Sequence, residues 1–191
     1  MYMLRAVTNK DFPMLRQAMK ATFNIELDYD PEFEPKGKFS LYKIFMNSLI
    51  PADPQGRIRI IFVSCEDLSG GWRRDTDVIG FNIAQKKLIF VAVPKTIEAI
   101  EPDCYYAPRT LEGYLIAITF HELYENITGD VHHCGHPGTC INSECQYHGN
   151  GTCSACMGGF IDKKFPDIAL EDIYCEEHLS NLKRALAKNG Y

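Results

Sequence analysis

The residues of this chain best suited to chemistry are concentrated between positions 121 and 178. That stretch contains all six histidines and six of the eight cysteines. It opens with His121 and Glu122, and Glu125 follows. If residues 111–128 form a helix, His121 and Glu125 lie one turn apart on one face and can bind the same metal ion, with Glu122 beside them. This is the geometry of a zinc hydrolase in which a carboxylate replaces the second histidine ligand.

A glutamate in the second ligand position has a chemical consequence. In zinc peptidases with the His-Glu-x-x-His motif, two histidines fix the ion and the glutamate activates a bound water. Glu125 is an acceptable zinc ligand, but its negative charge donates more density to the ion than an imidazole does. We therefore expect a bound water that is harder to ionise, and slower hydrolysis. The alternative interpretation of the same residues is a solvated helix face without a function.

The segment after the predicted helix supplies further ligands. Gly129 is suited to the left-handed turn that ends a helix, and His132, His133 and Cys134 follow it. This order resembles the metzincin clan, whose helix motif continues through a glycine to a third histidine. More narrowly it resembles the archaemetzincins, in which a cysteine follows that histidine directly.

A methionine and a cysteine–histidine pair extend the resemblance. Archaemetzincins have a methionine beneath the catalytic ion, and a Cys-x-x-Cys pair that helps to bind a structural zinc lies at a fixed distance after it. Here seventeen residues separate Met157 from Cys175, and His178 stands where the family has its last cysteine. The spacing agrees with the family.

The resemblance implies an α+β fold. The expected architecture is a zincin-like (metzincin) domain with a mixed, mostly parallel sheet, an active-site helix and a C-terminal Cys/His zinc-binding subdomain. One domain would span residues 1–191, with the sheet and active-site helix in 1–130 and a metal-stapled subdomain in 131–191.

The activity that the resemblance implies is that of a zinc metallopeptidase. His121, Glu125 and either His132 or His133 would hold the catalytic zinc, with Glu122 as general base and Met157 as the hydrophobic floor. The family's count from the glycine to its histidine favours His132. A peptide or protein substrate would bind by strand addition to an edge strand near Leu88 to Val93.

The chain departs from the archaemetzincin pattern in four places. Glu125 replaces a histidine, and one extra residue precedes Gly129 while another separates it from Cys134. The family's Cys-x-Met becomes Cys156-Met157, and a cysteine-rich insertion lies between Cys134 and Cys156. These changes motivate a second hypothesis, a catalytically impaired binding protein that keeps the fold and its structural zinc.

A second group of ligands has the spacing of a structural zinc site. Two x-x-separated pairs lie about twenty residues apart, which is typical of such sites. The members are Cys153 and Cys156 in the first pair, and Cys175 and His178 in the second. Cys134 competes with Cys153 for one position, since the family uses the cysteine beside its third histidine.

The insertion contains three more candidate ligands, which are Cys140, Cys145 and His148. With the remaining cysteine they could bind a third ion; alternatively, the two cysteines are free thiols on a loop. An iron–sulfur cluster is a third interpretation of the cysteine-rich segment. It would give a brown protein, whereas a zinc protein is colourless.

Composition limits the class of protein. Hydrophobic residues make up 46% of the 191 residues and the formal net charge is −5, as in ordinary globular chains. The acidic balance argues against nucleic acid as a partner. No apolar run approaches the roughly 20 residues that cross a bilayer, and the N-terminus lacks a signal pattern. We therefore expect a cytoplasmic protein without a membrane partner, in which reduced cysteines hold metal.

Periodicity predicts the elements that must position these residues. Amphipathic helices are expected over residues 11–25, with Asp11 as a cap, and over residues 39–50. Strands are expected at residues 57–65, 77–84 and 87–93, and the last two are expected to form a hairpin. The active-site helix is expected at residues 111–128, and a final helix from Glu176 to Ala187.

Overall fold

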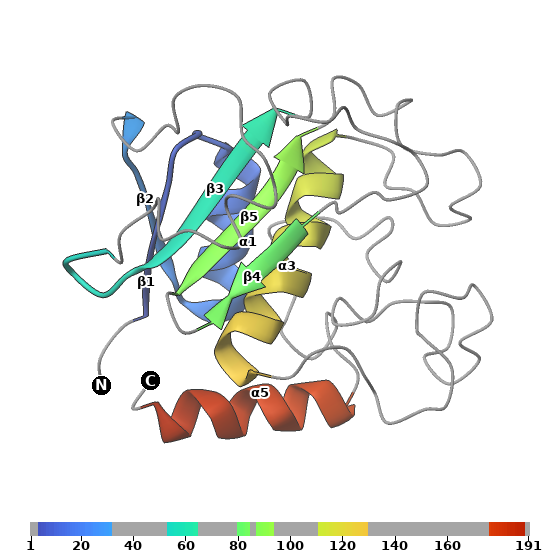
Figure 1. The fold of residues 1–191 in the computed structure, drawn as a ribbon. Helices are drawn as coiled ribbons and strands as arrows, with labels where there is room; N and C mark the ends of the chain where they lie inside the picture. Colours follow the sequence, from blue (N-terminus) through green and yellow to red (C-terminus); the bar gives the residue numbers. More distant parts are fainter. Residues whose placement is uncertain are drawn as a thin grey trace.

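The computed structural model of the chain describes residues 4–31, 53–64, 80–84, 87–93, 111–129 and 176–189. Its strands form one sheet in the order β2-β1-β3-β5-β4 (Figure 1). The strands are β1 (Arg5–Thr8), β2 (Glu26–Tyr29), β3 (Ile58–Ser64), β4 (Gly80–Ile83) and β5 (Leu88–Val93). Every neighbouring pair is parallel except β4 and β5, which are antiparallel. The expected mixed, mostly parallel sheet is confirmed.

Strands β3 and β5 form the centre of the sheet. They pair along their length, with Ile60 opposite Ile89 and Phe62 opposite Val91. Nearly every residue of both strands is buried, which is why both sequences are mostly apolar; Arg59 of β3 is a buried polar exception. The strand predicted at 57–65 is confirmed.

The hairpin is confirmed as well, but its first strand, not its second, lies at the edge of the described sheet. The segment from Leu88 to Val93 was expected to be an edge strand; this is wrong, because β5 lies between β3 and β4. The outermost strand on this side of the described sheet is β4, in which Gly80 pairs with Val91 and Asn82 with Ile89. A run without polar alternation belongs in the interior of a sheet, whereas β4 carries glycine and asparagine.

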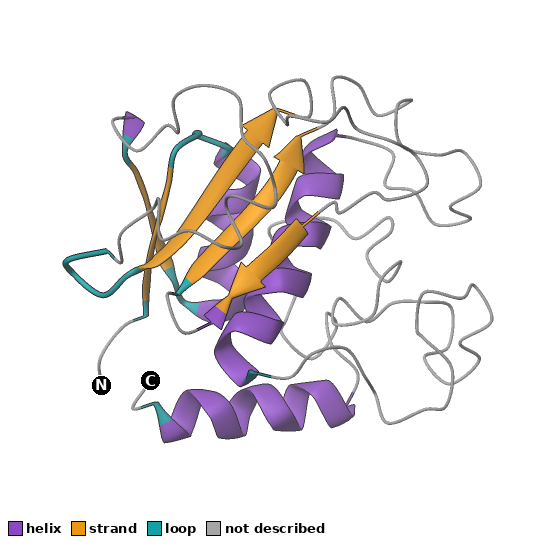
Figure 2. Cartoon of the chain, viewed as in Figure 1, coloured by secondary structure: helices purple, strands orange, loops and turns teal. Residues whose placement is uncertain are grey.

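Helix α1 (Pro13–Phe23) packs beside α3 (Leu111–Thr128) on one face of the sheet, and both lie behind the strands in Figure 2. Leu15 and Met19 of α1 are fully buried. The expected cap at Asp11 is wrong: Phe12 occupies the cap position without a side-chain hydrogen bond, and Asp11 pairs with Arg16 instead. Proline at the first helical position sets the start of α1.

Helix α3 is the most buried helix of the described chain, and its predicted span is confirmed. Leu115, Ile116 and Leu123 are fully buried, and Phe120 meets Phe23 of α1 edge-to-face with ring centroids 4.9 Å apart. The helix ends as expected at Gly129, whose φ is +71° and whose N–H donates to the Glu125 carbonyl at 2.8 Å.

Helix α5 (Glu176–Lys188) runs past the C-terminal end of α3, as Figure 1 shows, and confirms the last predicted helix. Leu182 joins the hydrophobic core, and the ring of His178 lies edge-to-face on Tyr124 of α3 with centroids 5.1 Å apart. The helix predicted over residues 39–50 lies outside the described residues. Among the helices that are described, none has both the length and the apolar character needed to cross a bilayer.

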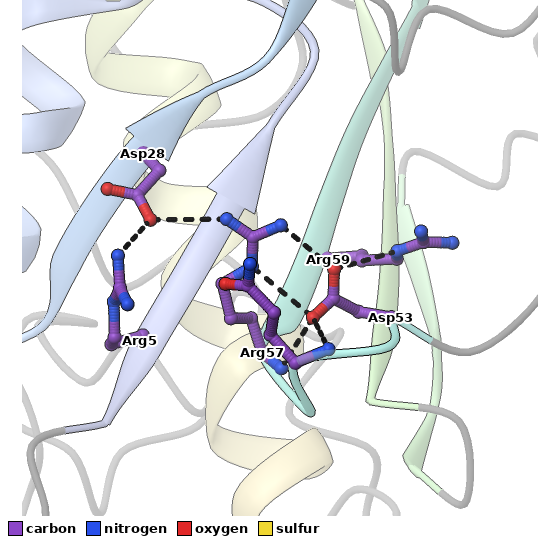
Figure 3. A network of polar contacts seen from close by, with 6 residues as sticks. Arg5, Asp28, Asp53, Arg57 and Arg59 are labelled. Atoms are coloured by element: carbon purple, nitrogen blue, oxygen red, sulfur yellow. Dashed lines mark hydrogen bonds and ion pairs between the residues drawn. The ribbon is translucent and has the colours of Figure 1, made fainter.

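A polar network joins β1, β2 and the start of β3 (Figure 3). The carboxylate of Asp53 accepts hydrogen bonds from the N–H groups of Gln55 and Arg57 and from the Arg57 guanidinium, and its side chain is only 2% exposed. Burial alone would raise the pKa of Asp53, but the hydrogen bonds and charge of Arg57 outweigh it and lower that pKa. Arg57 also donates to Asp28, which accepts from Arg5 at 2.8 Å. The network fixes the chain where it enters the central strand.

Candidate metal centre on helix α3

His121 and Glu125 lie side by side on α3, as expected for residues one turn apart. The Nε2 atom of His121 is 3.4 Å from Oε1 of Glu125, and the two residues are 3% and 6% exposed. Zinc bonds of about 2.0–2.2 Å to nitrogen and oxygen place two ligands of a tetrahedral site roughly 3.4 Å apart. The observed separation therefore suits two neighbouring corners of a zinc site. This is a fit of donor type and spacing, made by one helical turn.

Glu122 lies beside this pair and is 5% exposed. Its pKa is raised to about 8, first because burial disfavours the charged carboxylate and second because of the negative charge of Glu125. A hydrogen bond from Asn82 acts in the opposite direction. Near neutral pH this carboxyl group can therefore both hold and release a proton.

Asn82 of β4 contacts both glutamates from the sheet. Its Nδ2 donates to Oε2 of Glu125 at 2.6 Å and lies 3.4 Å from Oε2 of Glu122. Sequence spacing does not predict a role for Asn82, because the contact joins a strand to a helix about forty positions away. A polar residue in a short strand just before the hairpin turn was the only signal, and many strands carry one.

Gly80 lets α3 approach β4 closely. A Cβ at this position would lie 2.7 Å from both Oε1 of Glu122 and Cγ2 of Ile118. Only glycine fits such a contact without displacing the helix side chains. Gly80 and Asn82 thus form the wall of the site on the side of the sheet.

The structure brings together three of the residues predicted for the catalytic site: His121, Glu122 and Glu125. Within the described part of the chain, no three His, Cys, Asp or Glu side chains are placed so that they could enclose an ion. Both candidates for the third ligand lie outside that part. So do the expected structural ligands other than His178; the predicted residues concerned are His132, His133, Cys134, Cys140, Cys145, His148, Cys153, Cys156 and Cys175.

His178 is the one expected structural ligand that the structure describes. It is 1% exposed, in the first turn of α5, and its ring contacts Tyr124, the residue before Glu125. The imidazole is therefore in the interface between α5 and α3.

Comparison of the chain with protein-family models, with curated proteins and with solved structures gives no match.

Proposed function

We propose that the chain is a zinc-dependent metallopeptidase of the metzincin type, with the catalytic ion held by His121, Glu125 and His132 or His133. The observation that carries the proposal is the burial of two glutamates beside a histidine on one side of α3. A second, structural zinc would be held by Cys156, Cys175, His178 and either Cys153 or Cys134.

Electrostatics favours a cation at this position. Two carboxylates three positions apart on a helix repel each other, and burial removes the water that would screen them. They lie in the C-terminal half of α3, where the helix dipole is negative, and the last turn of α3 contains no basic residue. A divalent cation bound here would be attracted both by the two carboxylates and by the negative end of the helix dipole.

The proposed chemistry assigns the proton to Glu122. Zinc in this site would supply a Lewis acid and lower the pKa of water. Glu122 would take the proton of the attacking water on its carboxylate and pass it to the leaving amine. The pKa of about 8 is that of the metal-free chain, and a bound cation would lower it toward the working pH, where the carboxylate can accept the proton. Glu125 faces His121 instead and serves as a ligand.

The substrate proposed is a peptide that pairs with β4. This strand is the outermost of the described sheet on that side, and its residues Gly80 and Asn82 border the site. An extended peptide beside β4 would place a backbone carbonyl near Glu122 by strand addition. The proposal places the protein in the cytoplasm, where thiols stay reduced and available to zinc.

Elemental analysis and a peptidase assay test the proposal. The purified protein should contain at least two zinc equivalents, and Glu125→Ala should lose about one of them. Glu122→Gln should keep the metal and lose hydrolysis of a mixed peptide library. Glu112→Gln is the matched control, because Glu112 is also on α3 but caps the first turn of α1 through the Met14 N–H; it should change neither. Full zinc retention in Glu125→Ala would remove that residue from the ligand set, and activity in Glu122→Gln would assign the base elsewhere.

The second candidate is a binding protein that holds zinc in the same site without turnover. Glu125 in the second ligand position favours it, because a carboxylate ligand donates more charge to the ion than an imidazole and makes the bound water harder to ionise. A wild-type protein that holds both zinc equivalents and cleaves no peptide in the library would select this candidate.

A further inference from the structure

We infer that Asn82 is a positioning residue that holds Glu125 so that the carboxylate offers one oxygen, Oε1, to the metal ion. The inference depends on the proposed function, since it concerns how the same site binds its ion. Neither the His-Glu motif nor the resemblance to archaemetzincins assigns a role to this residue.

The two oxygens of Glu125 have different surroundings. Oε2 accepts the hydrogen bond from Asn82 at 2.6 Å, and Oε1 lies 3.4 Å from the His121 Nε2 atom. A hydrogen bond to an ionised carboxylate is short and directional, so it resists rotation of the group. Oε1 is therefore the oxygen that stays beside the histidine, at the spacing of two zinc ligands.

An asparagine suits this role better than a basic residue would. Its amide carries two N–H donors, which allows one contact with Glu125 and a longer one with Glu122. The amide is also neutral, so it orients the carboxylates without cancelling the negative charge that attracts a cation. The ammonium group of a lysine here would neutralise the carboxylates and so compete with the metal ion.

The backbone of β4 keeps this amide in place. Asn82 pairs with Ile89 in the antiparallel ladder, one residue from the hairpin-side end of the strand, and its side chain is half-buried. Gly80, two positions earlier on the same face of the strand, brings the helix within reach. The strand thus acts as a rigid support for the orientation of the ligand.

Asn126 provides a matched control. It is the next residue on α3 after Glu125, and its amide also joins the helix to the sheet, by donating to the Leu88 carbonyl of β5 at 3.4 Å. Asn126→Ala therefore removes an amide contact between helix and sheet without touching a carboxylate. Removal of a group that orients a metal ligand typically lowers metal affinity by about 10- to 100-fold.

The experiment measures zinc affinity of the full chain by competition with a chromophoric chelator, for the wild type and for Asn82→Ala, Asn126→Ala and His121→Ala. The α3 site is the zinc that His121→Ala loses. Asn82→Ala should weaken that site by about 10- to 100-fold and Asn126→Ala by less than about threefold. Equal losses in the two asparagine variants would overturn the positioning role. No zinc lost in His121→Ala would instead refute the proposed function, so the two failures are distinguishable.

Cobalt(II) substitution tests how many oxygens bind. Its visible absorption at the α3 site, taken as the difference from His121→Ala, reports coordination number. Asn82→Ala should lower the absorption, because a released carboxylate can bind through both oxygens, and Asn126→Ala should leave it unchanged. A spectrum that is the same in Asn82→Ala and wild type would overturn the assignment of a single oxygen.

Discussion

The close approach of α3 to β4 predicts the effect of Gly80→Ala. The added methyl group would lie 2.7 Å from Cγ2 of Ile118 and from Oε1 of Glu122, where ordinary contacts begin at 3.4 Å. The Ile118 methyl is on a β-branched side chain with one favoured rotamer in a helix, so it cannot swing aside. The helix or the strand must move, and either movement shifts the Glu122 carboxylate relative to β4.

The magnitude follows from two opposing terms. Overpacking of this kind costs about 1–3 kcal/mol, while replacing a strand glycine by alanine returns about 0.5–1 kcal/mol of backbone entropy. The midpoints of the two terms give a net loss of about 1 kcal/mol in the free energy of unfolding, measured by urea denaturation. Because displacement of a reacting group by 1 Å can cost about 100-fold, peptide hydrolysis should fall by at least about tenfold.

Gly56→Ala separates the two effects. Gly56 has a φ of +69°, but a Cβ there would meet nothing within 4 Å. The variant should lose about 1–2 kcal/mol through backbone strain alone and keep the activity of the wild type. The reasoning is refuted if Gly80→Ala is as stable as the wild type, or if both variants lose activity in proportion to stability.

Three further changes test the buried polar groups by denaturation. Glu122→Gln should stabilise the metal-free chain increasingly from pH 4.5 to about 8, by up to roughly 5 kcal/mol, because the native carboxyl keeps a proton that the unfolded one releases; a difference that does not vary with pH would contradict this. Asp53→Asn should cost roughly 3 kcal/mol at pH 7, against nearly nothing for the exposed Asp11→Asn, and this cost should shrink as the pH falls below 3.8 through the lowered pKa of Asp53. Asn9→Ala removes hydrogen bonds to both the N–H and the carbonyl of Phe62, at 2.8 and 2.9 Å, and should cost about 2–4 kcal/mol; an unchanged denaturation midpoint would show that water replaces them.

The sequence predicts those elements that carry a strong local pattern. The apolar runs of β3 and β5, the long apolar α3 and the amphipathic α5 were all found at nearly their observed bounds. The two missed strands, β1 and β2, are four residues long. In β2, alternation over Glu26–Tyr29 buries only Leu27, so the segment resembles a polar connector. Strands this short are fixed by their neighbours rather than by their own composition.

In the candidate site, too, the residues joined by local spacing are predictable from the sequence, and those joined by the strand order are not. One helical turn places His121, Glu122 and Glu125 together, so their proximity follows from sequence spacing. Asn82 and Gly80 belong to the site only because β4 lies at the edge of the sheet beside α3. That contact depends on strand order. The sequence predicts β5 as the edge strand, so it does not predict that β4 lies beside the site.

The buried polar residues of α3 are not explained by stability, because they are concentrated in the second half of an otherwise apolar helix. The helix is buried around nearly its whole circumference, and its first half is mostly apolar. His121, Glu122, Glu125 and Asn126 then follow within six residues, all buried. Apolar residues of similar volume would usually be at least as stable as buried charged groups. Asn126 donates to the sheet and Asn82 donates to Oε2 of Glu125, yet the pKa of Glu122 stays raised. Burial of these carboxylates lowers the stability of the metal-free chain, and this loss is confined to one side of one helix. The same side carries ligand residues at ligand spacing, as expected where a bound cation would offset the loss.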